Sequence, residues 1–361
     1  MPKDVQLNRR KSGKSVGRSA QNSPTSLSSE KSTNAAGGGA GFLKVVFIIV
    51  IWYCTSCLAT TGTKVIMKMK ILAPEELLLF QMGMTVFYLR IFGSFGILRF
   101  NFTNSSLWKL RFEIFVISCS YLIGFLLLQL GLRMVSVSFA VTMRGFEPVT
   151  TCFMSIFILS EAMNKAQWVA VSLVVVGVSL CAGADRSWNG NGLFVLFLCD
   201  LSFSSRSLFV KLLRRKCSGL NVEQMNGASI YFVTTMIGAI FLLMYCASKY
   251  LGVASLIFKS TGEASSQLSL RGVLNQIAEN SVRLFVNSLS FTLYNTSSYI
   301  LLGMVEMHVH AVGNAVRQVV VICYSVYMFS TVLTVSNMVG ILCVTSGVTL
   351  YSVYTKLKIS K

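Results

Sequence analysis

Long apolar segments separated by short polar stretches recur along the chain from Leu43 almost to its end. A helix that crosses a bilayer needs about 20 consecutive, mostly apolar residues. The pattern predicts ten such helices, at 43–64, 77–98, 112–131, 136–158, 166–184, 192–213, 226–247, 284–304, 308–329 and 335–354. We therefore expect an all-α polytopic membrane protein with ten transmembrane helices.

Residues 1–42 have a different composition, rich in Ser, Gly, Asn, Lys and Arg with few bulky apolar side chains. Such a segment cannot bury enough apolar surface to offset the entropy lost on ordering. We expect 1–42 to be a disordered, basic, Ser-rich cytosolic tail and 358–361 to be a short cytosolic tail. The Ser- and Arg-rich, acid-poor composition leaves a transit peptide open as an alternative for 1–42.

A weak internal repeat divides the apolar part of the chain into two halves. Gly-Val-Ser-Leu at 177–180 parallels Gly-Val-Thr-Leu at 347–350, and each follows a predicted helix with one arginine, Arg144 or Arg317. Halves of five helices each must have opposite topology, an arrangement that many transporters build around a site at the membrane midplane. We expect two inverted five-helix repeats, at 43–190 and 191–357.

Composition supports the membrane assignment. The chain is 53% hydrophobic and 12% charged, against about 45–50% and 25% in a soluble domain. Its 32 Lys and Arg residues exceed its 13 Asp and Glu residues, giving a net charge of +19. Because these cations are dispersed over short loops, we expect no nucleic-acid partner. Their excess on one side of the predicted helices places both termini in the cytosol.

Charged residues inside the predicted helices are the candidates for function. They are Arg90, Arg144, Arg206, Arg317, Glu147 and Asp200. A charge near the bilayer centre costs about 2.5–3.5 kcal/mol on insertion scales, so each should face a cavity or a partner. Arg90 lies close enough to a helix end to reach the interface.

Glu147 and Arg206 are expected to form a buried structural ion pair. Arg144 and Arg317 then have no evident carboxylate left, Asp200 being the one candidate. Two such cations in matching halves predict a binding site for an anion, and guanidinium geometry suits phosphate.

Metal binding and catalysis find little support in the sequence. His308 and His310 lie near Glu306, and Cys54 and Cys57 have zinc-like spacing, but neither group has the third and fourth ligands that a closed site needs. We expect no metal, no cofactor and no enzyme, because GxSxG, Walker A and HExxH motifs are absent from the sequence. A lipid-modifying membrane enzyme and a non-transporting receptor or scaffold are the rival classes.

Two segments resemble a known family. VSVSFAVTMRGFEP (135–148) and LYNTSSYILLGMVEMHVHAVGNAVRQVVVI (293–322) are similar to the fourth- and ninth-helix regions of the triose-phosphate translocator family. This family lies within the drug/metabolite transporter superfamily, which also holds nucleotide-sugar transporters. TKVIMKMKILAPEELLLFQM (63–82) and SSRSLFVKLL (204–213) are similar to further segments of these carriers.

The resemblance implies a set of substrate-binding residues. Arg144 matches a basic residue of the fourth helix, and Arg317 and Gln318 match a Lys-Arg pair of the ninth, so the second cation is replaced by an amide. Tyr294 matches a tyrosine that contacts the substrate, and His310 matches a histidine at the entrance to the ninth helix.

Other positions show where this chain departs from plastid members of the family. Phe125 and Leu128 fall where those members carry a histidine and a threonine. Glu147 and Arg206 fall on a family acid and a family arginine, which is compatible with the expected pair. The lost cation and polar groups leave the mode of binding but put triose phosphate itself in doubt.

We therefore expect a membrane antiporter that exchanges phosphorylated metabolites, such as sugar phosphates or related organic phosphates, across an organelle membrane. A nucleotide-sugar transporter of the Golgi or ER is the alternative. The expected partners are a small anionic phosphorylated substrate and the lipid bilayer, and a homodimer is left open. The use of the first helix as the targeting anchor favours the Golgi or ER, with a plastid inner membrane as the alternative.

Overall fold

A computed structural model describes residues 38–101, 104–159, 165–184, 189–219, 225–250, 270–304, 307–330 and 334–359. The chain divides into two units, Met1–Leu43 and Lys44–Lys361. Of the first unit, only the beginning of helix α1 is described, so nearly all of the expected tail 1–42 lies outside the described residues. The fold considered below is that of the second unit.

The described residues form a series of helices. They are α1 (Gly38–Lys68), α2 (Pro74–Ser94), α3 (Asn104–Lys109), α4 (Arg111–Met134), α5 (Val137–Met143), the 3₁₀ helix η1 (Arg144–Phe146), α6 (Glu147–Leu159), α7 (Lys165–Ala184), α8 (Gly190–Gly219), α9 (Gly227–Tyr250), α11 (Leu270–Glu279), α12 (Ser281–Met304), α13 (Met307–Phe329) and α14 (Val335–Ile359). Each predicted range overlaps a described helix, although α2 ends at Ser94 and not at residue 98. The short helices α3 and α11 were not predicted.

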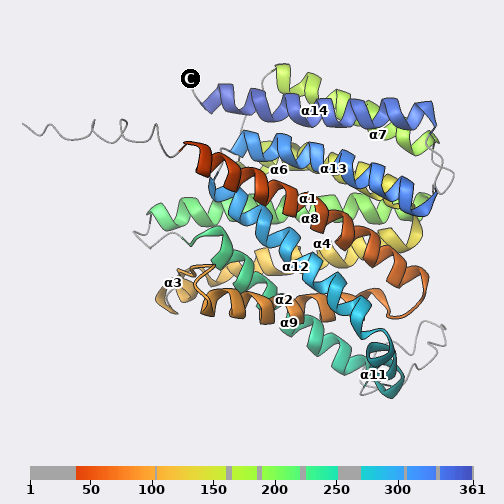
Figure 1. Cartoon of the computed structure of the whole chain (residues 1–361). Helices are drawn as coiled ribbons and strands as arrows, with labels where there is room; N and C mark the ends of the chain where they lie inside the picture. Colours follow the sequence, from red (N-terminus) through yellow and green to blue (C-terminus); the bar gives the residue numbers. More distant parts are fainter. Residues whose placement is uncertain are drawn as a thin grey trace, which may run out of the picture. The chain divides into compact units, whose positions relative to one another are not determined.

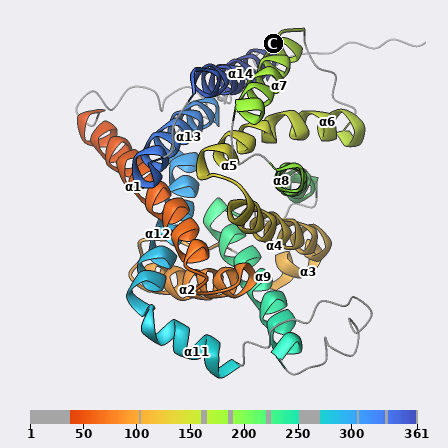
Figure 2. The same ribbon diagram turned by 90° about the vertical axis from the view of Figure 1, so that its right-hand side faces the viewer.

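The prediction of one continuous helix at 136–158 is wrong. Ser136 caps α5 by accepting a hydrogen bond from the Phe139 N–H at 3.1 Å, and α5 then ends at Met143. The chain passes through η1 into α6, which leaves in a different direction (Figure 2). Pro148 explains the break, because it has no backbone N–H with which to continue the helical hydrogen-bond ladder. The break places Arg144 at the junction.

Five described helices are long and apolar enough to cross a membrane: α1 from Leu43, α2, α4, α8 over Gly190–Val210, and α9. Shorter apolar segments lie in α7 and α14. Helix α12 is more polar because it contains residues such as Asn287, Ser288 and Thr292, all of which are buried. The described chain is thus a multi-pass, all-helical membrane protein, whereas the total of ten spans and their inverted arrangement stay predictions.

The closest helix packing joins segments far apart in the sequence. Helices α7 and α14 lie side by side along their length (Figure 1), and α4 packs on α8 in the same way. The first of these contacts depends on glycine. A Cβ on Gly340 would lie 2.6 Å from the backbone oxygen of Gly177, and a Cβ on Gly347 would lie 2.8 Å from that of Ala170. Neither position can hold a larger residue without a shift of the backbone.

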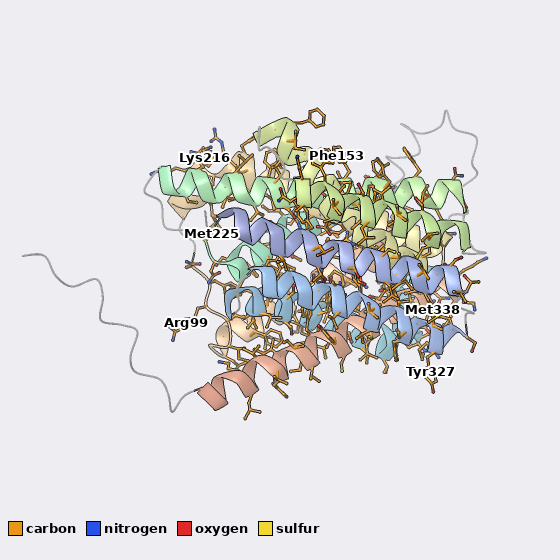
Figure 3. The ribbon with its side chains drawn as sticks, turned by 90° about the horizontal axis from the view of Figure 1, so that it is seen from above. Arg99, Phe153, Lys216, Met225, Tyr327 and Met338 are labelled. Carbon is orange, nitrogen blue, oxygen red and sulfur yellow. The ribbon has the colours of Figure 1, made fainter. Side chains whose placement is uncertain are left out.

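The helices present two distinct ends. Arg99 and Lys216 lie at one end, and Tyr327 and Met338 lie at the other (Figure 3). Many large apolar side chains between the ends are exposed, among them Phe87, Phe157 and Val169. A soluble protein rarely exposes so many, whereas lipid covers them without cost.

Candidate anion-binding site

Arg144 occupies the junction between α5 and η1, where its side chain meets residues from α6 and α8. The Nη2 of Arg144 donates to Glu147 Oε2 at 2.8 Å, and its Nη1 lies 3.6 Å from Asp200 Oδ1. Nη1 also lies 3.6 Å from the Cys199 sulfur, and the guanidinium carbon lies 4.0 Å from the centre of the Phe203 ring. The site around Arg144 therefore combines two carboxylates with an aromatic face.

These contacts correct the expected ion pairing. Arg144 was predicted to have no carboxylate beyond the candidate Asp200, but Glu147 binds it directly because η1 brings position i+3 into reach. The predicted pair of Glu147 with Arg206 is not formed among the described contacts. Arg206 instead places its guanidinium carbon 5.0 Å from the centre of the Phe203 ring and 5.9 Å from that of Tyr121.

Phe203 accordingly lies between two guanidinium groups, those of Arg144 and Arg206. Its ring also meets that of Phe125, at 5.1 Å between centres. Stacking on aromatic faces holds a guanidinium group in place without neutralising its charge. Phe125 thus supports the ring on which Arg144 rests.

Arg317 lies on α13 and has neutral partners. Its Nε donates to Asn314 Oδ1 at 3.0 Å, and its Nη1 donates to the Ser56 hydroxyl on α1 at 2.5 Å. Its guanidinium carbon lies 5.3 Å from the ring centre of Tyr294 and 5.7 Å from that of Trp52. Among the residues whose side chains are described, no carboxylate lies within ion-pair distance of Arg317. Its charge is therefore stabilised by hydroxyl, amide and aromatic groups alone within this part of the chain.

Tyr294, on α12, lies beside Arg317, whose guanidinium carbon is 5.3 Å from its ring centre. The segment that carries Arg144 lies close by, because the Oε1 of Gln318, the neighbour of Arg317, is 3.8 Å from the Cβ position of Gly145, the neighbour of Arg144. Arg144 comes from the first half of the chain, whereas Tyr294 and Arg317 come from the second. Two cations and a tyrosine thus lie on neighbouring segments from different halves of the chain.

The remaining predicted residues lie at the edge of this group or outside the description. Gln318 is 6% exposed, and its Oε1 lies 3.8 Å from the place where a Cβ on Gly145 would be, next to Arg144. The side chain of His310 lies outside the described residues, as does that of His308. Within the described residues, His, Cys, Asp and Glu form no group of three that could hold a metal ion.

Sequence reasoning missed the residues that α1 contributes. Ser56 is fully buried, Trp52 is 1% exposed, and both meet Arg317. The available signal was weak: a serine and a tryptophan one helical turn apart in an otherwise apolar segment. Tyr53 adds a second link, because its hydroxyl donates to the backbone oxygen of Gly313 at 2.7 Å.

The chemistry of the group suits an oxyanion. Guanidinium groups bind phosphate or carboxylate through paired, charge-assisted hydrogen bonds. Arg317 has its charge unneutralised within the described residues, and Arg144 can exchange Glu147 for a stronger anionic partner.

Comparison with known proteins finds a matching family and similar chains. A family model described as the Triose-phosphate Transporter family matches residues 43–352. The chain is 27% identical over 263 residues to the chloroplastic triose phosphate/phosphate translocator of Zea mays, covering 72% of this chain and 58% of the relative. It is 28% identical over 240 residues to the chloroplastic phosphoenolpyruvate/phosphate translocator 2 of Arabidopsis thaliana, covering 65% and 58%.

The match therefore spans a little under six tenths of the length of these relatives. A solved structure titled "Crystal structure of protein" aligns with a TM-score of 0.47 and 13% identity, over 88% of this chain and 98% of the other.

Proposed function

Because this chain belongs to the Triose-phosphate Transporter family, we propose that it is a membrane antiporter that exchanges phosphorylated metabolites across an organelle membrane. The observation that carries the proposal is that Arg144 and Arg317, from different halves of the chain, lie on segments in contact: Gln318, next to Arg317, has its Oε1 3.8 Å from the Cβ position of Gly145, next to Arg144, and Tyr294 lies beside Arg317. Relatives in this family are named as translocators of phosphate with triose phosphate or phosphoenolpyruvate. Their names favour sugar phosphates and related organic phosphates over nucleotide sugars.

In this proposal, Arg144 and Arg317 hold the phosphate group and Tyr294 donates a hydrogen bond to it. Gln318 and His310 contact the rest of the substrate. An amide at 318 both donates and accepts hydrogen bonds, so it suits hydroxyl groups better than a second negative charge. The substrate should therefore carry its negative charge on one phosphate group.

Binding would couple the two halves of the carrier. Arg144 is held by Glu147, and Arg317 is held by Asn314 and Ser56. A phosphate that accepts hydrogen bonds from both guanidinium groups draws η1 and α13 together. Bringing the two cations together in a desolvated site without an anion is unfavourable, because like charges repel. Closure then needs a bound anion, which produces exchange and not net flux.

The helix contacts support an arrangement of ten transmembrane helices as two inverted repeats. Helices at equivalent positions of the halves pack on each other, α2 on α9 and α7 on α14, and the contact of α4 with α9 mirrors that of α12 with α2. Helix α4 packs closely on α8, and at the equivalent place in the other half Asn287 of α12 donates to the backbone oxygen of Ala59 on α1 at 3.0 Å. If α12 packed closely on α1 while α4 moved away from α8, the site would open to the opposite side of the membrane.

The compartment and orientation also belong to the proposal. The relatives are chloroplastic, which favours a plastid membrane over the Golgi or ER. Within Lys44–Lys361, α1 begins and α14 ends on the side where Arg99 and Lys216 lie (Figures 1 and 3). The basic residues on that side support its placement in the cytosol.

Counterflow in liposomes tests the function. The purified protein is reconstituted into vesicles loaded with inorganic phosphate, and uptake of labelled phosphate, triose phosphate, phosphoenolpyruvate and a nucleotide sugar is measured. We expect uptake of the small phosphates that depends on internal phosphate. Substrate consumption would indicate an enzyme, and equal uptake into empty vesicles would contradict exchange.

A further inference from the structure

A basic cavity distinct from the arginine site lies at the end of the helices opposite Arg99 and Lys216. It has a volume of about 320 Å³, enough for roughly ten water molecules at about 30 Å³ each. It opens between the ends of α1, α4 and α13 and the start of α5. The residues that give it its chemistry are Lys64, Lys68, Arg133, Ser136, Ser138 and Ser325.

The cavity is lined by positive charge. Lys64, Lys68 and Arg133 contribute three cations, and none of the described residues that line the cavity is acidic. Among the ion pairs formed within the described residues, none involves these three side chains. A concave surface with one sign of charge concentrates ions of the opposite sign and raises their rate of association by about 10–1,000-fold.

Lys64 has a structural role that the other two cations lack. Its ammonium group donates to the backbone oxygens of Leu132 and Val135, at 2.5 and 2.7 Å, where it caps the end of α4. Lys68 and Arg133 are exposed at the mouth of the cavity. The cavity therefore has a fixed cation within it and two accessible cations at its entrance.

Three helices connect this cavity to the arginine site. Helix α1 carries Ser56 at the site and Lys64 at the cavity, α13 carries Arg317 and Ser325, and α5 leads from Ser138 to Arg144. The members of each pair are six to eight residues apart, which corresponds to about 9–12 Å along a helix. Along these helices the cavity therefore lies about 9–12 Å from the arginines, between them and one end of the protein.

We propose that this cavity is an outer binding site for the phosphate group of the substrate, which is captured there before it reaches Arg144 and Arg317. This inference rests on the proposed function. Lys68 and Arg133 make the first contact with the anion, and the serine hydroxyls supply further hydrogen-bond partners. A phospholipid headgroup offers the same phosphate chemistry, so the test separates the two sources.

The experiment uses the full-length chain with Lys68 and Arg133 both replaced by Gln, in vesicles of uniform orientation made from phosphatidylcholine alone. The KM for inorganic phosphate is measured separately from each face. We expect a rise of about tenfold on the face where the cavity opens, with kcat and the KM on the other face unchanged. A Glu pair at the same positions should raise the KM further, and high salt should reduce the difference because it screens exposed charges.

Arg283→Gln is the matched control. Arg283 is exposed at the same end, where its Nη1 lies 3.7 Å from the Met69 sulfur, but it does not line the cavity. Its loss should leave both KM values unchanged. A rise equal to that of the Lys68/Arg133 variant would assign the effect to general surface charge and overturn the proposal.

Two further outcomes are decisive. An unchanged KM in the Lys68/Arg133 variant, with normal exchange by the wild type, would overturn the outer site and leave the proposed function standing. An effect that appears only when phosphatidylglycerol is added to the vesicles would assign the cavity to lipid and overturn substrate capture. If the wild type itself does not exchange phosphate, the proposed function fails first.

Discussion

The two site arginines differ in what surrounds their charge. Arg144 faces Glu147 and Asp200, whereas Arg317 donates to the neutral oxygens of Asn314 and Ser56. An anion binding between them would compete with Glu147 for Arg144 but with no described carboxylate for Arg317. The two residues should therefore contribute to binding by different routes.

Replacing either arginine by alanine should abolish exchange. A charged hydrogen bond lost from a desolvated site costs about 2–5 kcal/mol in binding, which corresponds to tens- to thousands-fold in affinity. Counterflow of Arg144→Ala and Arg317→Ala in vesicles is the measurement, with size-exclusion profiles as the check on folding. Arg90→Ala is the control, because Arg90 is exposed on α2. Normal counterflow in either site variant would exclude that arginine from the site.

Glu147→Gln should lower the KM for phosphate. The carboxylate competes with the substrate for Arg144, and a hydrogen bond to a charged group contributes about 1.5–3 kcal/mol. We expect a decrease in KM of about tenfold in steady-state exchange. Glu279→Gln changes an exposed carboxylate on α11 and should leave KM unchanged. A higher KM for Glu147→Gln would show that Glu147 positions Arg144 for the substrate instead of competing with it.

At the scale of elements, the contact of α7 with α14 depends on two facing glycines. A Cβ on Gly340 would lie 2.5 Å from the Cys181 sulfur and 2.6 Å from the Gly177 oxygen. The helices can approach this closely because neither glycine has a side chain, as in other membrane helix pairs with small residues. The same region carries the repeated Gly-Val-Ser/Thr-Leu motif.

Gly340→Ala should therefore destabilise the protein. Overpacking of a tight contact costs about 1–3 kcal/mol, because the backbone oxygen of Gly177 cannot move without shifting α7. The melting temperature in detergent is the measurement, and we expect a clear decrease. Gly183→Ala is the matched control, since nothing lies within 4 Å of its Cβ position. Equal melting temperatures for the two variants would refute the role assigned to the glycine contact.

At the scale of the whole second unit, ion pairs at both ends join the two halves of the chain. At one end, Lys249 binds Glu75 at 2.9 Å and Glu76 at 3.3 Å, and Tyr250 donates to Glu76. At the other end, Lys216 binds Glu113. A carrier that opens one end at a time must loosen these contacts alternately.

Removing the ion pairs at one end should shift the equilibrium between the state open at that end and the state open at the other end. Partly exposed ion pairs contribute about 0.2–1 kcal/mol each, so the shift should be up to a few-fold. Lys249→Gln should lower the KM for phosphate on its own face and raise it on the opposite face, and Lys216→Gln should do the reverse. Exchange measured from each face checks this, with exposed Lys109→Gln as the control. Shifts in the same direction for both variants would exclude a gating role.

The sequence by itself determined where the helices are and which charges lie inside them. In a bilayer the backbone must satisfy its hydrogen bonds within each segment, so long apolar segments give helices whatever they pack against. Arg144, Arg317 and Tyr294 were identified in this way and through a family resemblance that the family model confirms. The break in the fourth predicted helix was also encoded, because Pro148 stands three residues after Gly145.

Only the tertiary structure decided which groups meet. Arg317 and Ser56 are 261 residues apart, and no periodic pattern along the chain specifies such a pairing. Glu147 was expected to pair with Arg206 of α8, whereas in the structure it binds Arg144, three residues before it. The outer cavity draws its cations and serines from the ends of several helices. Its existence depends on how those helices pack, which local sequence does not fix.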